Sequence, residues 1–323
     1  MVSKFVNKDC TFNYDKLHDV VKIMTINLNK IIDINYYPTD KTRRSNFLHR
    51  PVGIGIQGLA DAFILMNVPY HSAKAKEVNK YIFETIYHAS LEASNEISIE
   101  RQKGMLFIKE EVKKKTLCFS TDNPEETELD ILNVLLEGPD NKLIHELEDK
   151  LISLKELYKP ILKETQIENP NYLGAYSSFE GSPASKGLLQ FDLWNEKPST
   201  RYDWDRLKQS IQKHGLRNSL CVAPMPTAST SQILGNNECF EPFTSNIYTR
   251  RTLAGEFIVV NKYLIQELTD QGLWSEDVKN NIVANKGSVQ YINGISEHLK
   301  EKYKIVWEIP MKHLIDMARD RGC

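Results

Sequence analysis

An apolar run that leads straight into a hydroxyl-rich turn constrains the fold of this chain more than any other feature. Residues 218–225 (Asn-Ser-Leu-Cys-Val-Ala-Pro-Met) are typical of a buried β-strand, and residues 226–235 supply the turn and the start of a helix. A strand followed at once by a helix is the βα unit of a parallel sheet or barrel. The chain is therefore predicted to have an α/β fold, in which ligands collect at the carboxyl ends of the strands.

The turn itself is the best candidate for a ligand site. Ser229 is followed three residues later by Gln232, which fits a capping box, so we expect a helix to begin near Ser229 with its first backbone N–H groups pointing outward. These N–H groups, the positive end of the helix dipole and three nearby hydroxyl groups would form a phosphate site that needs no lysine. An ordinary helix cap is the alternative interpretation. Residues 236–238 and 249–251 flank the turn, either as contacts to an anion or as ordinary surface.

Periodic apolar residues predict the other elements. The apolar residues from Leu17 to Ile32 share one helical face, and this helix should end before Pro38. A short glycine-rich strand is expected at residues 52–58, followed by a buried helix at residues 59–66. Further helices are expected at residues 78–97, 256–270 and 297–319.

Residues 105–174 differ in character from the rest of the chain. They are highly charged and poor in glycine, and within residues 144–161 apolar side chains recur at steps of three and four, as in the seam of a coiled coil or helical hairpin. The charges are more typical of a solvated face than of a binding surface. We therefore expect three regions: an α/β portion at 1–104, a charged helical insertion at 105–174, and an α/β portion at 175–323 that carries the turn.

Composition excludes several classes of partner. With a net charge of -2 and a pI near 6.5, the chain lacks the basic balance of a dedicated nucleic-acid binder. No stretch reaches the roughly 18 uninterrupted apolar residues of a membrane-spanning helix, and the first residues contain no apolar leader core. We therefore expect a cytoplasmic protein that binds neither polymeric nucleic acid nor a membrane.

The cysteines and histidines do not indicate a redox or metal centre. The five cysteines form no CxxC pair, and the eight histidines show no HxxxH or HxxE spacing, so we expect neither a disulfide framework nor a metal site. No Ser-His-Asp or GxSxG arrangement indicates a hydrolase either. Cys323 has no polar tail after it, which suggests that the chain was cut there.

Residues 53–58 match the dinucleotide pattern GxGxxG literally. That pattern requires a strand before the glycines, whereas these glycines alternate with Val52, Ile54 and Ile56 as they would inside a strand. We interpret them as positions of close backbone approach. An NAD-dependent dehydrogenase is the alternative, and a nicotinamide titration would test it.

Longer motifs resemble one family. Residues 27–38, 49–61, 180–183, 223–230 (Ala-Pro-Met-Pro-Thr-Ala-Ser-Thr) and 241–251 resemble, in this order, the eukaryotic-type large subunit of class I ribonucleoside-diphosphate reductase. The resemblance implies a ten-stranded α/β barrel made of two half-barrels. This chain would form roughly the second half, with residues 105–174 as an inserted helical module.

The resemblance also implies a function and a site. The family reduces ribonucleoside diphosphates to deoxyribonucleoside diphosphates for DNA synthesis by a thiyl-radical mechanism. By resemblance, Thr227, Ala228, Ser229 and Thr230 hold the substrate diphosphate at a helix N-terminus. The implied partners are a small subunit that carries a di-iron tyrosyl radical and a second large subunit in a homodimer, while nucleotide effectors bind the upstream part of the large subunit.

The reactive groups of the family fall outside this chain. Its radical cysteine, its reducing cysteine pair and its effector-binding cone lie upstream, and its radical-relay tyrosines and C-terminal shuttle cysteines lie beyond Cys323. We therefore expect no catalytic, cofactor-binding or metal-binding residue here, and an inactive isolated chain. The alternative is a non-catalytic interaction or structural fragment whose charged insertion docks a partner.

Overall fold

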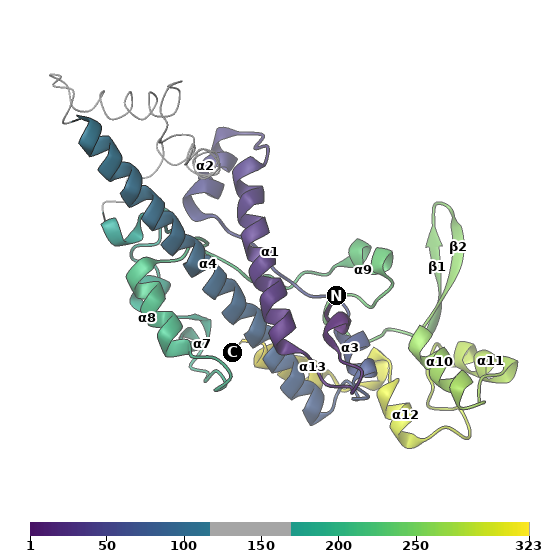
Figure 1. Cartoon of the computed structure of the whole chain (residues 1–323). Helices are drawn as coiled ribbons and strands as arrows, with labels where there is room; N and C mark the ends of the chain where they lie inside the picture. Colours follow the sequence, from purple (N-terminus) through teal and green to yellow (C-terminus); the bar gives the residue numbers. More distant parts are fainter. Residues whose placement is uncertain (117–168, 323) are drawn as a thin grey trace.

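The computed structural model describes residues 1–116 and 169–322 and is built mainly of helices (Figure 1). A long helix, α4 (Ala73–Thr116), crosses the molecule, and α1 (Tyr14–Ile34) packs along it. None of the helices in the described ranges combines the length and the apolar character needed to span a bilayer. The other elements, in chain order, are η1 (Val2–Phe5), α2 (Asp40–His49), α3 (Leu59–Leu65), η2 (Pro170–Tyr172), η3 (Ala184–Lys186), α7 (Gln190–Leu193), α8 (Trp204–His214), α9 (Ala228–Leu234), β1 (Ile247–Thr252), β2 (Gly255–Val260), α10 (Lys262–Asp270), α11 (Glu276–Ala284), α12 (Glu297–Lys302), η4 (Val306–Glu308) and α13 (Met311–Asp320).

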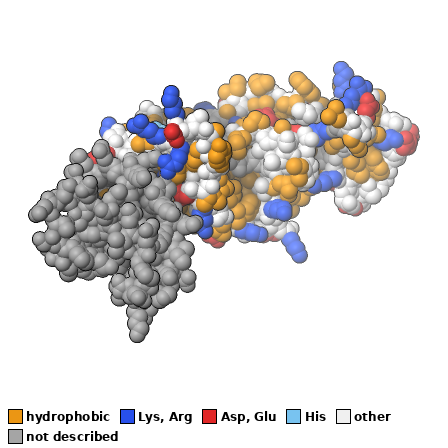
Figure 2. All heavy atoms as spheres, turned by 90° about the horizontal axis from the view of Figure 1, so that it is seen from above, with side chains coloured by type: hydrophobic (Ala, Val, Ile, Leu, Met, Phe, Trp, Pro, Cys, Tyr) orange, Lys and Arg blue, Asp and Glu red, His pale blue; other side chains and the backbone are white. Residues whose placement is uncertain are grey.

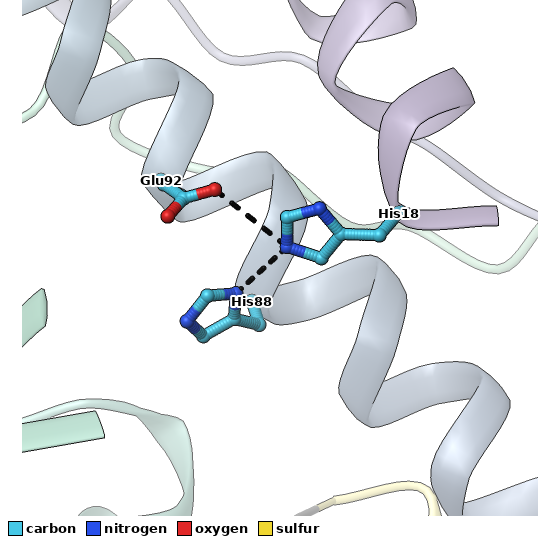
Figure 3. Close-up of side chains that lie close together, drawn as sticks. All are labelled: His18, His88 and Glu92. Carbon is cyan, nitrogen blue, oxygen red and sulfur yellow. Dashed lines mark hydrogen bonds and ion pairs between the residues drawn. The ribbon is translucent and has the colours of Figure 1, made fainter. Parts of the chain in front are cut away.

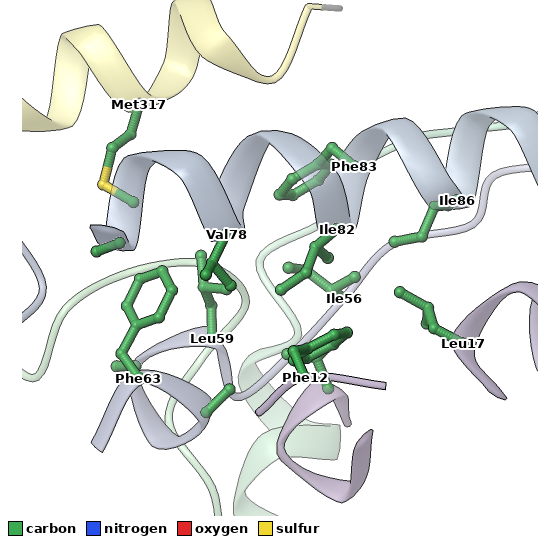
Figure 4. Packing of buried hydrophobic residues seen from close by; sticks show 14 of the residues in the cluster. Phe12, Leu17, Ile56, Leu59, Phe63, Val78, Ile82, Phe83, Ile86 and Met317 are labelled. Carbon is green, nitrogen blue, oxygen red and sulfur yellow. The ribbon is translucent and has the colours of Figure 1, made fainter. Parts of the chain in front are cut away.

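The two long helices form the main core together. Asn13 caps α1 by accepting a hydrogen bond from the Lys16 N–H at 2.9 Å, and the helix ends before Pro38. The shared cluster (Figure 4) includes Leu17 of α1, Leu59 and Phe63 of α3, and Val78, Ile82, Phe83 and Ile86 of α4. The helices predicted at residues 17–32, 59–66 and 78–97 are thus confirmed.

The two predicted strands lie side by side and run parallel, but they form one isolated bridge rather than a ladder. Ile54 pairs with Val222, and the Ala223 N–H donates back to the Ile54 carbonyl at 3.0 Å. Each segment leads into a helix, α3 and α9 respectively, as the βα prediction required. The prediction of full strands at 52–58 and 218–225 is wrong. Pro224 and Pro226 have no N–H to donate, so the 218–225 segment cannot pair with a further strand on its opposite side at these positions.

Two glycines allow the paired segments to approach each other. A Cβ added to Gly53 would lie 3.0 Å from the Ala223 Cβ, and one added to Gly55 would lie 2.9 Å from the Ala223 carbonyl oxygen. The interpretation of the glycines as positions of close backbone approach is confirmed, and the glycine run lies within the extended segment itself.

The helix predicted at residues 256–270 is only half present. Residues 256–260 belong to β2, which pairs antiparallel with β1, and α10 begins at Lys262. Gly255, at φ 135°, sits at the turn of this hairpin, and the following Phe-Ile-Val-Val run favours an extended conformation. Asn261 then caps α10, so the helix begins six residues later than the apolar spacing suggested.

The single helix predicted at residues 297–319 is two helices. α12 ends at Lys302, the turn η4 follows, and α13 begins at Met311 directly after Pro310. Proline lacks the N–H that a helix interior needs and disfavours helical conformation in the residue before it. Pro310 therefore divides the predicted helix and starts the second one.

The start of the predicted insertion is not marked by a helix end, because α4 continues to Thr116. Residues 144–161, with the predicted coiled-coil seam, lie outside the described residues. The chain nevertheless returns to the place that it left: the Gln102 side-chain amide donates to the Pro170 carbonyl at 3.0 Å, and a Cβ on Gly174 would lie 1.7 Å from the Ser98 carbonyl oxygen. Adjacent entry and exit points are what an insertion requires, and the division into three regions stays a prediction.

Candidate functional site

The turn before α9 places a threonine in an unusual backbone conformation. Thr227 is the N-cap of α9, with φ 54° and ψ 28°, in the left-handed region. Its hydroxyl oxygen accepts a hydrogen bond from the Cys239 N–H at 2.8 Å. The helix begins at Ala228, close to the predicted start, but the predicted capping box of Ser229 and Gln232 does not form, because Ser229 already lies inside the first turn of the helix.

The N-terminal end of α9 faces solvent. The first hydrogen bond of its ladder runs from the Ser231 N–H to the Thr227 carbonyl at 2.9 Å, so the N–H groups of Ala228, Ser229 and Thr230 have no partner within the helix. All three of these residues are exposed, whereas Ser231 is buried and donates its hydroxyl to the Ala228 carbonyl. Three backbone donors and the Ser229 hydroxyl are thus presented on one exposed surface, an arrangement suited to an anion.

A buried glutamine joins this turn to the glycine segment. Thr230 donates its hydroxyl to the side-chain oxygen of Gln57 at 2.9 Å, and Gln57 is 7% exposed. The next residue, Gly58, donates its N–H to the Asn237 carbonyl at 3.1 Å. The glycine segment therefore holds α9 at both of its ends.

A buried carboxylate fixes the loop that follows α9. Asp61, on α3, is 1% exposed and accepts a hydrogen bond from the Asn237 N–H at 2.9 Å. Burial raises the pKa of Asp61, and the hydrogen bonds from Asn237 and Tyr263 oppose this shift. Gln57 and Asp61 were not among the predicted site residues. The available signal was their place in the motif at residues 49–61, next to the glycines.

A cavity of about 370 Å³ lies beside α9 and not at its N-terminal end. From α9 only Ser231 and Gln232 line it, together with Asp61, Arg250 and Lys262 from other elements. Lys262 donates to the Gly235 carbonyl at 2.9 Å, and an Arg250 nitrogen lies 3.7 Å from a Glu238 oxygen. Arg251, by contrast, pairs with Glu256 across the hairpin. Of the flanking residues in the prediction, 236–238 and Arg250 therefore line this cavity, and Arg251 belongs to the hairpin surface.

A second cavity, of about 590 Å³, lies along the 218–225 segment. It is lined mostly by apolar side chains, among them Phe83, Tyr87 and Leu91 of α4, and by Cys221. Burial raises the pKa of the Cys221 thiol to about 12, so this sulfur stays protonated at neutral pH and is no nucleophile.

The whole chain is similar to one family of known proteins. The model of the family described as "Ribonucleotide reductase, barrel domain" matches residues 1–159 and 161–323. The match runs through the predicted insertion with a gap of one residue.

Curated relatives carry the same description of function. The ribonucleoside-diphosphate reductase large chain of Schizosaccharomyces pombe is 48% identical over 315 residues, which cover 98% of this chain and 30% of the relative. The large subunit of Arabidopsis thaliana is 44% identical over 98% of this chain and 30% of its own length. The large subunit of Caenorhabditis elegans is 43% identical over 99% of this chain and 32% of its own length. The chain thus spans about a third of the length of these relatives.

A solved structure supports the fold. The class Id ribonucleotide reductase alpha subunit of Actinobacillus ureae superposes on 95% of this chain with a TM-score of 0.52. The two sequences are 19% identical, and the superposition covers 38% of that subunit.

Proposed function

Because the chain belongs to the ribonucleotide reductase barrel-domain family, we propose that it forms part of a large subunit that reduces ribonucleoside diphosphates, and that it supplies the binding site for the substrate diphosphate. The observation that carries the proposal is the exposed N-terminal end of α9. It lies in the segment that the resemblance assigns to the diphosphate, and it presents N–H groups with no partner in the helix.

In this proposal Thr227, Ala228, Ser229 and Thr230 have different tasks. The N–H groups of residues 228–230 and the Ser229 hydroxyl donate to phosphate oxygens, with the helix dipole adding positive potential. Thr227 positions the turn by accepting the Cys239 N–H, and its O–H can still donate to a phosphate oxygen. Thr230 is anchored in turn by Gln57. Anchoring the non-reacting phosphates fixes the sugar against the reacting groups of the complete enzyme.

The chemistry would come from elsewhere in the assembly. A thiyl radical would abstract the 3′ hydrogen of the ribose, the 2′ hydroxyl would leave as water, and a dithiol would supply two electrons and become a disulfide. We assign none of these groups to this chain. The radical would come from a small subunit with a di-iron tyrosyl centre, and effectors would bind the upstream part of a dimeric large subunit. The cytoplasmic location expected from the sequence stays a prediction.

The paired segments around Ile54 and Val222 would lie next to each other in the wall of a ten-stranded barrel. Their parallel direction, their short hydrogen-bonded contact and the helices that follow them support this proposal. The described residues contain one hairpin of two strands and no barrel sheet.

Ser229→Ala tests the site in a large subunit reconstituted from this chain and an upstream part, assayed with a small subunit. Loss of one charge-assisted hydrogen bond, worth about 1.5–3 kcal/mol, should weaken diphosphate affinity roughly 10–100-fold. Thr227→Ala should also weaken diphosphate affinity, because it removes the hydrogen bond with the Cys239 N–H that fixes the turn.

The matched control is Ser231→Ala. The Ser231 hydroxyl belongs to the same helix but is buried. The Ser231→Ala substitution should therefore lower the stability of the chain and leave its diphosphate affinity unchanged. An active complex in which Ser229→Ala binds substrate like the parent would refute the site. Turnover by this chain alone, without an upstream part, would refute the proposed division of labour.

A further inference from the structure

Three side chains with metal-binding atoms meet where α1 and α4 pack together (Figure 3). They are His18 of α1 and His88 and Glu92 of α4, and their ligand atoms all lie within 4.8 Å of one another. His18 Nε2 is 2.9 Å from His88 Nδ1 and 3.6 Å from a Glu92 oxygen. The group escapes a search for local ligand spacing, because His18 and His88 are 70 residues apart in the sequence.

Aromatic packing holds both imidazole rings in place. The His88 ring stacks on Tyr202 with centroids 4.2 Å apart, and the His18 ring stacks on the same tyrosine at 5.5 Å. Tyr202 is itself fixed, because its hydroxyl donates to Thr85 Oγ1 at 2.9 Å. Ligands whose orientation is set by packing lose little freedom when an ion binds.

Both distances from His18 Nε2 suit a small divalent ion, and the carboxylate of Glu92, whose nearest oxygen lies within 4.8 Å of His88 Nδ1, turns towards the ion to complete the set. In a tetrahedral zinc site with Zn–N bonds of about 2.0–2.1 Å, neighbouring ligand atoms are roughly 3.3 Å apart. The two distances from His18 Nε2, 2.9 Å and 3.6 Å, lie on either side of this value. Two imidazoles and one carboxylate, with a fourth position left for water, form a known zinc ligand set.

We infer that His18, His88 and Glu92 bind a divalent transition-metal ion, with Zn²⁺ as the best fit, and that this ion clamps α1 to α4. Both helices contribute to the main core, so the clamp would stabilise the folded chain. The inference does not depend on the proposed diphosphate site and assigns the ion no part in the reaction.

Lys22 competes with the ion for the carboxylate of Glu92. Its ammonium lies 3.0 Å from a Glu92 oxygen and 2.7 Å from a Glu96 oxygen. When the ion binds, Glu92 turns towards it and Lys22 keeps Glu96. The competition makes Lys22 a sensitive probe of the site.

The test uses the full 323-residue chain without an affinity tag and freed of metal. Titration with Co²⁺ should give the ligand-field absorption of a four-coordinate site at one ion per chain, Zn²⁺ should displace it, and Zn²⁺ should raise the midpoint of thermal unfolding. His18→Asn and Glu92→Gln should each weaken Zn²⁺ binding at least about tenfold in calorimetry, while far-ultraviolet circular dichroism shows that they fold. Absence of Co²⁺ absorption and of Zn²⁺ binding in the parent chain would overturn the inference.

Two further variants locate the ion. Lys22→Met should tighten Zn²⁺ binding severalfold, since it removes the cation that holds Glu92; unchanged affinity would overturn the role of Glu92. His71→Asn tests a rival position, where His71 pairs with Glu301 at 2.7 Å and packs against His313. The His71→Asn variant should bind Zn²⁺ with unchanged affinity. Weaker Zn²⁺ binding by His71→Asn, together with unchanged binding by His18→Asn, would overturn the site.

Discussion

Asn218 is fully buried, and its side chain uses every hydrogen bond that it can make. Its side-chain oxygen accepts from Asn29 at 2.8 Å and from Ser94 at 3.0 Å, and its amide donates to the Asn29 side-chain oxygen and to the Arg50 carbonyl. The residue thus ties the extended segment to α1 and α4. Satisfied networks of this kind position a segment uniquely, and a partial network is costly.

Replacing Asn218 with leucine should lower the free energy of unfolding by about 2–4 kcal/mol, because it leaves buried groups of Asn29 and Ser94 without their partner. Urea denaturation of the chain measures the change. Asn171→Leu, at an exposed position, is the control and should change stability little. Equal stability of the two variants would contradict the role of the network.

The buried carboxylate of Asp61 should make the stability of the chain depend on pH. Burial raises the pKa of Asp61 in the folded chain above its value in the unfolded chain. The ionised carboxylate therefore lowers the free energy of unfolding at neutral pH. This destabilisation disappears in acid, where the carboxylate is protonated in both the folded and the unfolded state. Asp61→Asn keeps an acceptor for the Asn237 N–H and removes the charge. It should be at least as stable as the parent at pH 7, with the advantage shrinking as the pH falls through the folded pKa. Urea titrations at several pH values measure this difference, and an advantage that grows in acid would contradict it.

At the scale of elements, the contact between the two parallel segments depends on a missing side chain. A Cβ on Gly55 would meet the Ala223 backbone oxygen at 2.9 Å, whereas one on Gly53 would meet the more yielding Ala223 Cβ at 3.0 Å. Gly55→Ala should therefore destabilise the chain by about 1–3 kcal/mol, and Gly53→Ala by less. Chemical denaturation of both variants gives the comparison, and the reverse order would argue against this close approach.

Elements with a continuous apolar face could be predicted, and those decided by a distant partner could not. α1 buries one face along several turns, and α4 carries apolar residues at helical spacing although it is buried on nearly all sides between Ile82 and Asn95. The β1–β2 hairpin escaped prediction because the apolar residues of β2 run directly into those of α10, and only pairing with β1 marks the boundary. In the candidate site, the hydroxyl groups of the turn and the start of α9 could be predicted from the sequence. The contributions of Gln57 and Asp61 depend on contacts more than 170 residues away.

At the scale of the whole molecule, α1 presents a second apolar surface that nothing in the described residues covers. Its exposed members are Ile23, Met24, Ile26, Ile31 and Ile34. Figure 2 shows hydrophobic side chains spread over a broad part of one face. Exposed apolar surfaces of this extent are typical of sites that contact another protein surface.

We therefore expect the chain alone to self-associate as its concentration rises, and an upstream part of a large subunit to suppress this. Sedimentation velocity over a range of concentrations measures both effects. Ile26→Glu combined with Ile34→Glu should reduce self-association, whereas Lys30→Glu on the same helix should not. A chain that stays monomeric into the tens of micromolar would contradict the expectation.

The hydrogen bond from Gln102 to Pro170 has one more consequence. Because it brings two points 68 positions apart in sequence into contact, the polypeptide between them can change in length at little cost to the scaffold on either side. A reporter domain inserted between these two points should therefore leave the shape of the α9 surface unchanged.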